Sequence, residues 1–168
     1  MAASEQHAVS AISHPSLSSS LTSRRHSLNG TDLGVGGLGH NPIGQITYDP
    51  NGYMSVGMIS TTPGDIPPPR TPDKPTYDDF AKVGEHILAY AGELHIAWDN
   101  STVTSGRLYH GPLMMSSRTS WLGTNQTRNY DVTMNATETG GRDVLHLWLR
   151  NETSDKVANL FWARAPPT

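Results

Sequence analysis

Two polar side chains stand on an otherwise apolar face in one predicted strand of this 168-residue chain. Over residues 126–134, alternation places Gln126 and Arg128 on the same face as Tyr130, Val132 and Met134. A pocket for an oxygenated organic ligand needs this combination, because apolar walls supply burial and a few donors fix orientation. The alternative is that Gln126 and Arg128 lie at the rim and fasten the preceding loop. The pocket interpretation makes Arg128 a candidate catalytic residue and Gln126 a candidate substrate-binding residue.

Five ionisable residues could move a proton near such a pocket: Glu93, His95, His110, His86 and His146. Glu93 and His95 stand two positions apart in an alternating sequence, so they point the same way and could form an acid/base pair. The alternative is that both lie on an exposed sheet face. His110 precedes a Gly-Pro pair, which predicts that it ends a strand at a loop, where barrel mouths place functional groups; ordinary loop capping is the alternative. Glu93 and His110 are therefore candidate catalytic residues beside Arg128.

The other candidate substrate-binding residues are aromatic or carry sulfur. Tyr109 shares a predicted strand face with Arg107, and this pair has the same two interpretations as the residues above. With Gln126, the predicted substrate-binding set is Tyr109, Trp121, Tyr130 and Met54.

Composition and motifs exclude several kinds of chemistry. Twelve Lys and Arg against 15 Asp and Glu leave no cationic surplus for nucleic acid, and the absence of cysteine excludes disulfides and thiolate chemistry. The eight histidines show no metal-ligand spacing, and no nucleophile elbow, phosphate loop or dinucleotide fingerprint is present. No apolar run is long enough for a membrane span. We expect no cofactor, no nucleic acid, no membrane span and a cytoplasmic location; a homodimer is compatible with the sequence.

From residue 43 onward the sequence predicts seven strands and one helix. Residues 43–48 and 53–59 should form a hairpin around Asp-Pro-Asn-Gly, with Met54 on the apolar face of its second strand. A helix should start after Thr76, with Phe80, Val83, Ile87 and Leu88 on one apolar stripe that normally packs against another part of the protein. Further strands are expected over residues 89–98, 102–110, 126–134, 143–149 and 157–164. This pattern predicts an all-β, mainly antiparallel barrel with one short helix, and a sandwich or open curved sheet is the alternative.

The first part of the chain differs in composition from the rest. All twelve aromatic residues lie at or after Tyr48, and residues 1–30 are rich in serine. We expect a disordered Ser/Gly-rich leader over residues 1–37 and one domain over residues 38–165. A mitochondrial presequence, suggested by Arg24 and Arg25 among serines, is the alternative interpretation of the leader.

Several runs together resemble the lipocalin-like domain family of small bacterial and fungal proteins. The resemblance rests on residues 41–56, Tyr90-Ala91-Gly92, residues 121–128 and Trp162-Ala163-Arg164, and extends over about residues 38–165. It implies a calycin-type β-barrel with an internal cavity and a signature of Gly123, Thr124, Gln126 and Arg128. Family members usually open with Leu-x-Gly-Thr-Trp and a long first strand. This chain has Leu28-Asn29-Gly30-Thr31-Asp32, without the tryptophan, so the first strand is expected to be truncated or replaced.

Three functions are compatible with this sequence. The first is a cofactor-independent cyclase or isomerase of secondary metabolism, acting on a polyketide- or terpenoid-like intermediate; fungal relatives resemble proteins of such pathways. Arg128 and Gln126 would hold a carbonyl or enolate oxygen, and His110 or Glu93 would move a proton. The second is a carrier for a small hydrophobic, oxygenated metabolite. The third is a structural or degenerate paralogue, favoured if the barrel stays open.

Overall fold

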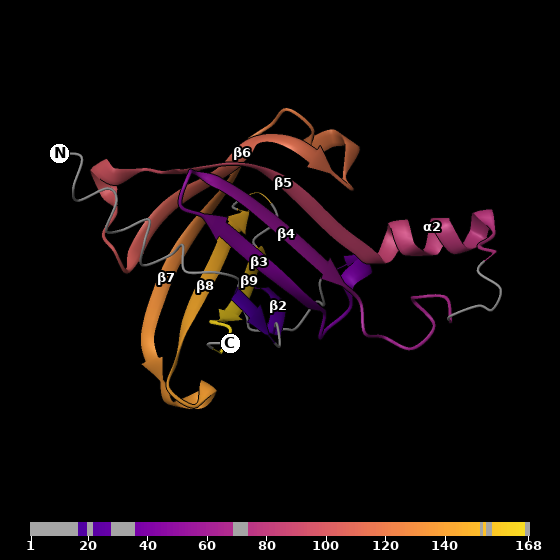
Figure 1. Cartoon of the computed structure of the whole chain (residues 1–168), viewed down its shortest axis with the longest axis horizontal. Helices are drawn as coiled ribbons and strands as arrows, with labels where there is room; N and C mark the ends of the chain where they lie inside the picture. The colour runs from indigo at the N-terminus through magenta and orange to yellow at the C-terminus, as the bar shows by residue number, and fades with distance from the viewer. Residues whose placement is uncertain are drawn as a thin grey trace.

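A computed structural model describes residues 17–19, 22–27, 36–68, 74–151, 153 and 156–166, with side chains from residue 36 onward. The described chain is one curved antiparallel sheet with a single α-helix, α2 (Tyr77–His86) (Figure 1). Seven strands form its body: β3 (Ile43–Asp49), β4 (Tyr53–Ile59), β5 (Ile87–Ile96), β6 (Ser105–Ser116), β7 (Gln126–Ala136), β8 (Arg142–Asn151) and β9 (Lys156–Ala163). The prediction of a mainly antiparallel barrel is confirmed.

The hairpin β3–β4 follows the sequence prediction closely. Its strands pair from Asp49 with Tyr53 to Ile43 with Ile59, around a turn in which Gly52 takes a φ of 85°. Met54, Val56 and Met58 are buried on the inner face, while Tyr53 and Ser55 are exposed. Each strand from β3 to β9 then pairs with its successor in the chain, so the sheet is a meander.

Strand β6 is longer than predicted and changes the position of His110. The strand is expected to end at His110, but it continues to Ser116. Gly92 of β5 pairs with Leu113 and Leu94 pairs with His110, so Gly111 and Pro112 form a bulge opposite one residue of β5. A bulge tolerates a proline, which cannot donate to the ladder. The prediction that His110 ends a strand at a loop is therefore wrong: it lies within β6 and is wholly buried.

Two short strands come from the segment expected to be a disordered leader. β1 (Leu17–Ser19) pairs with β3, and β2 (Thr22–Ser27) pairs along its whole length with β9. The leader expectation is wrong for these residues, because their backbone groups complete ladders at both edges of the sheet. Residues 1–16, 20–21 and 28–35, which include the remainder of that leader and its Leu-x-Gly-Thr stretch, lie outside the described residues.

The two short strands β1 and β2 pair with opposite edges of the meander, although they are close in sequence. The sheet order begins with β1 and ends with β2, and only two residues separate the two strands in the sequence. The segment at 17–27 therefore pairs with the first and last strands of the meander and makes the barrel nearly closed. The expectation of a truncated or replaced first strand was drawn from residues 28–33, which lie outside the described residues, and it stays a prediction.

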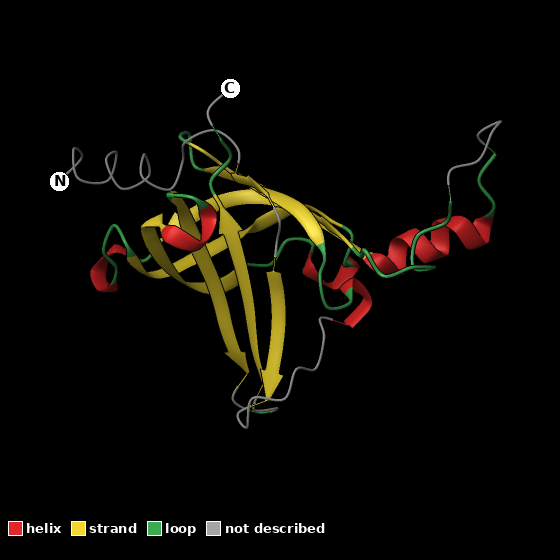
Figure 2. Cartoon of the chain, turned by 90° about the horizontal axis from the view of Figure 1, so that it is seen from below, coloured by secondary structure: helices red, strands yellow, loops and turns green. Residues whose placement is uncertain are grey.

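Helix α2 does not cover the core. Its start matches the prediction, since the Thr76 side chain and the Asp79 carboxylate form a reciprocal capping box. The predicted apolar stripe is wrong, because Ile87 and Leu88 belong to β5 and Phe80 is 62% exposed. Figures 1 and 2 show α2 projecting from the barrel as a continuation of β5. His86 fastens the base of the helix through its Nδ1 atom, 2.6 Å from the carbonyl oxygen of Gly37.

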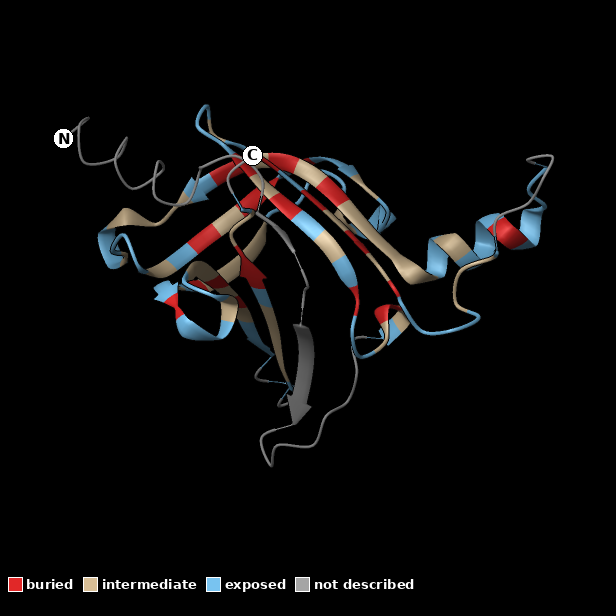
Figure 3. Ribbon diagram, turned by 60° about the horizontal axis from the view of Figure 1, so that its bottom comes forward, coloured by how far each residue is buried: buried red, intermediate tan, exposed pale blue. Residues whose placement is uncertain are grey.

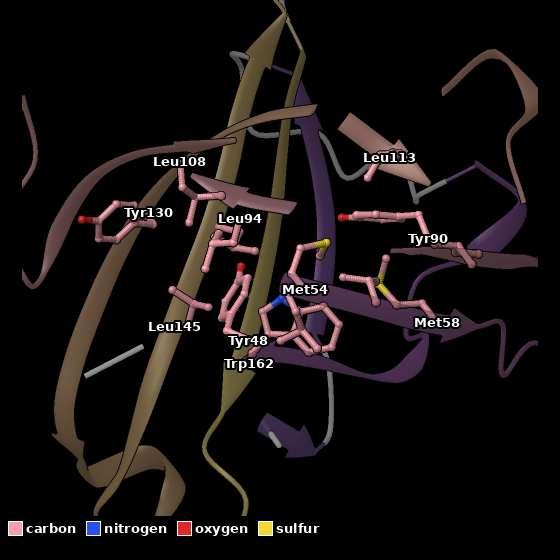
Figure 4. Packing of buried hydrophobic residues seen from close by; sticks show 14 residues of the cluster. Tyr48, Met54, Met58, Tyr90, Leu94, Leu108, Leu113, Tyr130, Leu145 and Trp162 are labelled. Atoms are coloured by element: carbon pink, nitrogen blue, oxygen red, sulfur yellow. The ribbon is translucent and has the colours of Figure 1, made fainter. Parts of the chain in front are cut away.

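The hydrophobic core lies inside the barrel. Buried residues alternate with exposed ones along the strands in Figure 3, as expected when one face of a sheet is covered. The inward side chains come from all seven strands of the body and are mixed aromatic and aliphatic (Figure 4): Ile46, Tyr48, Met54, Val56, Met58, Tyr90, Leu94, Leu108, Leu113, Tyr130, Leu145, Leu147 and Trp162. Any site inside the barrel is therefore lined by this continuous inner face of the sheet.

Candidate functional site

His110 is the centre of a polar cluster inside this core. Its Nε2 atom lies 2.9 Å from the hydroxyl oxygen of Tyr48, and its Nδ1 atom lies 3.3 Å from that of Tyr90. All three side chains are at most 2% exposed. They come from β6, β3 and β5, whose registers point alternate residues inward. The imidazole is therefore held by hydrogen bonds on both nitrogens within a largely apolar interior, an arrangement that we call the Tyr–His–Tyr cluster.

Burial determines the protonation state of this cluster. Burial, together with a smaller effect of the nearby positive charge of Arg128, lowers the pKa of His110 to about 3. Burial raises the pKa of Tyr48 well above its ordinary value, with a further increase from Tyr90 and an opposing effect of Arg128. Burial also raises the pKa of Tyr90, against the charge of Arg128 and a hydrogen bond from it. At neutral pH all three members are uncharged hydrogen-bonding groups.

Arg128 links the cluster to the loop between β6 and β7. It pairs with Leu108 in the β6–β7 ladder, which directs it to the inner face, and it donates to Tyr90. Its guanidinium carbon lies 5.9 Å from the ring centroid of Trp121, and Trp121 makes an edge contact with Tyr90 at 5.6 Å between ring centroids. Arg128 also donates to the Thr127 carbonyl at 2.6 Å. Because Arg128 and Trp121 are only partly buried, they connect the enclosed cluster to solvent.

The inner face of β7 is polar at one end and apolar toward the other, as the sequence indicated. Gln126 pairs with His110 in the ladder and donates to the Thr124 hydroxyl at 2.9 Å, so it fastens the preceding loop. Tyr130 is buried in the core, and its hydroxyl donates to the Thr102 carbonyl at 2.5 Å. Burial raises the pKa of Tyr130, against a hydrogen bond with Ser101. Met54 lies in the same core on β4.

Two predicted site residues lie on the other face of the sheet. Glu93 and Tyr109 each neighbour an inward residue, Leu94 and His110, and a strand turns successive side chains to opposite faces. Glu93 pairs with exposed His95, with 2.9 Å between Oε2 and Nε2. The prediction that Glu93 and Tyr109 share a pocket with His110 and Arg128 is therefore wrong. The two-residue spacing of Glu93 and His95 does give an ion pair, but on the outer surface.

Tyr109 instead lines a shallow hollow on the outer face. This hollow has a volume of about 400 Å³ and lies over β6, β7 and β8; its lining includes Arg107, Tyr109, Asn129, Asp131 and Trp148. Asp131 accepts a hydrogen bond from Trp148 Nε1 at 3.0 Å. The strand face shared by Arg107 and Tyr109 is thus solvated rather than part of the Tyr–His–Tyr cluster.

Sequence reasoning missed three inner residues. Tyr48 and Tyr90 stand on predicted apolar faces, where a tyrosine is most often interpreted as a core residue. Neither was therefore predicted as a site residue. Trp162 belongs to a run noted for the family resemblance, yet its wholly buried indole has an Nε1 atom with no hydrogen-bond partner in the described part of the chain. One general rule could have identified these residues. A tyrosine or tryptophan in the core carries a polar atom that normally needs a hydrogen-bond partner.

Within the described residues, no three His, Asp or Glu side chains come together as a metal site would require. None of the described helices has the length and apolar character needed to cross a membrane.

A family model for the lipocalin-like domain matches residues 22–165. The chain belongs to the lipocalin-like domain family. The match begins at the first residue of β2, so the strand that pairs with β9 is part of the lipocalin-like domain and not a leader to it. No curated protein and no solved structure matches the chain. The lipocalin-like barrel suggests a ligand-binding pocket, and the chemistry of that pocket is argued from its residues.

Proposed function

We propose that the lipocalin-like barrel binds a small hydrophobic, oxygenated metabolite and catalyses its cyclisation or isomerisation without a cofactor. The observation that carries the proposal is the Tyr–His–Tyr cluster, a neutral hydrogen-bonded group buried beside the positive charge of Arg128. Cyclisations and isomerisations rearrange bonds within one molecule without net oxidation, so positioned donors and an enclosing wall can suffice. A polyketide- or terpenoid-like intermediate of secondary metabolism has the required apolar body and oxygen atoms.

In this mechanism Arg128 stabilises negative charge that develops on a carbonyl oxygen of the substrate. Its guanidinium always carries a charge, and its position at the end of the apolar interior weakens the competition from water. Trp121 and Tyr90 hold the guanidinium by a cation–π contact and a hydrogen bond. Preorganised donors of this type typically account for about 10² to 10³ in rate.

The Tyr–His–Tyr cluster provides a route for a proton that avoids a charged imidazole. With a pKa of about 3, His110 does not store a proton at neutral pH. It can accept a proton at one nitrogen while it releases another from the opposite nitrogen, because a tyrosine hydroxyl contacts each side. The substrate would lose a proton at one position and regain it at another, which balances an isomerisation.

A carrier is the second candidate function. It is favoured by the same shifted pKa values, since groups that neither gain nor lose a proton readily at neutral pH also serve as fixed hydrogen-bonding groups for a ligand. The two functions share the ligand and the site, and they differ only in whether the ligand leaves changed.

The experiment begins by deleting the gene, identifying the metabolite that accumulates and incubating it with the purified protein. We expect faster product formation than in buffer, and a loss of about 10²-fold for Arg128→Met. Arg107→Met is the matched control, since Arg107 is on the adjoining strand but faces outward, and it should retain the wild-type rate. Tight binding with no conversion would establish the carrier; equal rates for both variants would remove Arg128 from the site.

A further inference from the structure

The barrel interior holds more hydrogen-bond donors than acceptors. Trp162 on β9 is 0% exposed, and its Nε1–H has no partner among the described residues, although nearly all buried donors in proteins have one. In Figure 4 the indole of Trp162 lies in the core and its nitrogen points toward Met54. An indole nitrogen can only donate, so the interior lacks an acceptor at this point.

The Tyr–His–Tyr cluster supplies a second surplus donor. A neutral imidazole has one N–H and one lone pair. It can therefore accept from only one of the two tyrosines, and it must donate to the other. The tyrosine that accepts keeps its own O–H free, whichever tautomer is present. No other side-chain hydrogen bond in the described part of the chain takes up a proton of Tyr48 or Tyr90.

Arg128 adds further donors of the same kind. Its guanidinium has five N–H groups and no acceptor, and its contacts use one toward the Thr127 carbonyl and one toward Tyr90. The interior thus presents an indole N–H, a tyrosine O–H and part of a guanidinium. Within the described residues, no buried side-chain acceptor is left unpaired to balance them.

We infer that the barrel selects ligands that carry at least two acceptor oxygens, such as ketone, ester, enolate or carboxylate oxygens, and that it excludes ammonium groups. This inference rests on the proposed binding function and names its ligand class. One oxygen pairs with Arg128 and the free tyrosine hydroxyl, and the second pairs with Trp162 Nε1. An ammonium group would meet the indole N–H of Trp162, which can only donate, and the positive charge of Arg128.

The core around Trp162 can adapt to such a ligand. Met54 and Met58 lie on the inner face of β4 and belong to the same buried cluster. Methionine side chains have three rotatable bonds and change shape at low cost. A ligand can therefore reach the indole by moving methionines, without disturbing the strands that hold Trp162 and the tyrosines.

The experiment follows the tryptophan indole N–H signals of ¹⁵N-labelled full-length protein during titration with 2-octanone, 2,4-octanedione, octanoate, octylamine and octane. Trp162→Phe assigns one of the four indole signals to Trp162, and Trp148→Phe is the matched control because Trp148 Nε1 already donates to Asp131 on the outer face. We expect the carbonyl compounds and octanoate to move the Trp162 signal downfield, with the dione bound most tightly. In Trp162→Phe the preference for 2-octanone over octane should fall roughly tenfold.

Three outcomes would overturn the inference. Octylamine that binds as well as 2-octanone, or carbonyl compounds that bind without moving the Trp162 signal, would refute the ligand class while leaving the binding function intact. No binding by any member of the panel would refute both. If Trp162→Phe does not fold, titration of the wild-type protein still gives the order of affinities for the five compounds. The spectrum of Trp148→Phe then identifies the signal of the outer indole, which leaves three candidates for the Trp162 signal.

Discussion

Lowering the pH should destabilise this protein through His110 in particular. The pKa of His110 is about 3 in the folded chain, against an ordinary value of 6.5. Between these values the unfolded chain binds a proton at His110 and the folded chain does not, so the free energy of unfolding falls as the pH falls. For these two pKa values the loss between about pH 6 and about pH 4 is about 2.5 kcal/mol, which approaches half the stability of a marginal domain.

Urea unfolding at a series of pH values, followed by tryptophan fluorescence, measures this loss. The wild type is compared with His110→Gln, which removes the titrating group, and with His95→Gln, which alters an exposed histidine on the outer face. The difference in unfolding free energy between wild type and His110→Gln should shrink by about 2.5 kcal/mol from about pH 6 to about pH 4. The same pH dependence in all three proteins would refute the burial of a neutral imidazole. His110 NMR signals that titrate near pH 6 would refute it independently.

Two further predictions concern stability. Leu108→Ala should lower the free energy of unfolding by about 2 to 5 kcal/mol, because Leu108 is 0% exposed. Leu122→Ala, at a half-exposed position, should change the free energy of unfolding by less than about 0.5 kcal/mol. Chemical denaturation measures both values, and similar losses in the two variants would contradict the inward face assigned to β6. Thr76→Ala removes one half of the capping box and should cost about 1 kcal/mol of local helix stability. Because α2 projects from the barrel, we expect faster amide exchange in α2 with little change in β5, and unchanged exchange in α2 would argue against the cap.

Local patterns in the sequence were sufficient for most of the sheet. The Asp-Pro-Asn-Gly turn and the alternation of Met54, Val56 and Met58 predicted the hairpin and the side chains that share its inner face, because both features depend on neighbours in sequence. The polar-to-apolar inner face of β7 was predicted for the same reason. The helix start was correct because a cap is local, but the helix end was not, since Ile87 and Leu88 suit a strand as well as a helical stripe.

Features that depend on distant residues were missed. The sequences of β1 and β2 have no aromatic residue and too little hydrophobicity to predict strands, and both become strands through pairing with β3 and β9. From the sequence alone, Gly111 and the proline after it predict the end of a strand. Only the register with β5 shows that β6 continues past a bulge at this point. The partners of His110 stand 62 and 20 residues away along the chain. Alternation alone placed Glu93 and His95 together but could not tell which face was inside.

The pairing of β2 with β9 also determines when the barrel can form during synthesis. β2 pairs with β9, so Thr22 meets Phe161 from the opposite end of the chain. The meander β3–β8 needs only hairpin contacts and can assemble as it emerges, while β2 has no partner until the last strand is complete. Contacts of such large sequence separation carry the greatest loop-closure cost and generally form slowly. A ribosome that pauses before β9 would therefore hold a curved sheet with an open edge, the state in which this chain is most exposed to pairing with another copy.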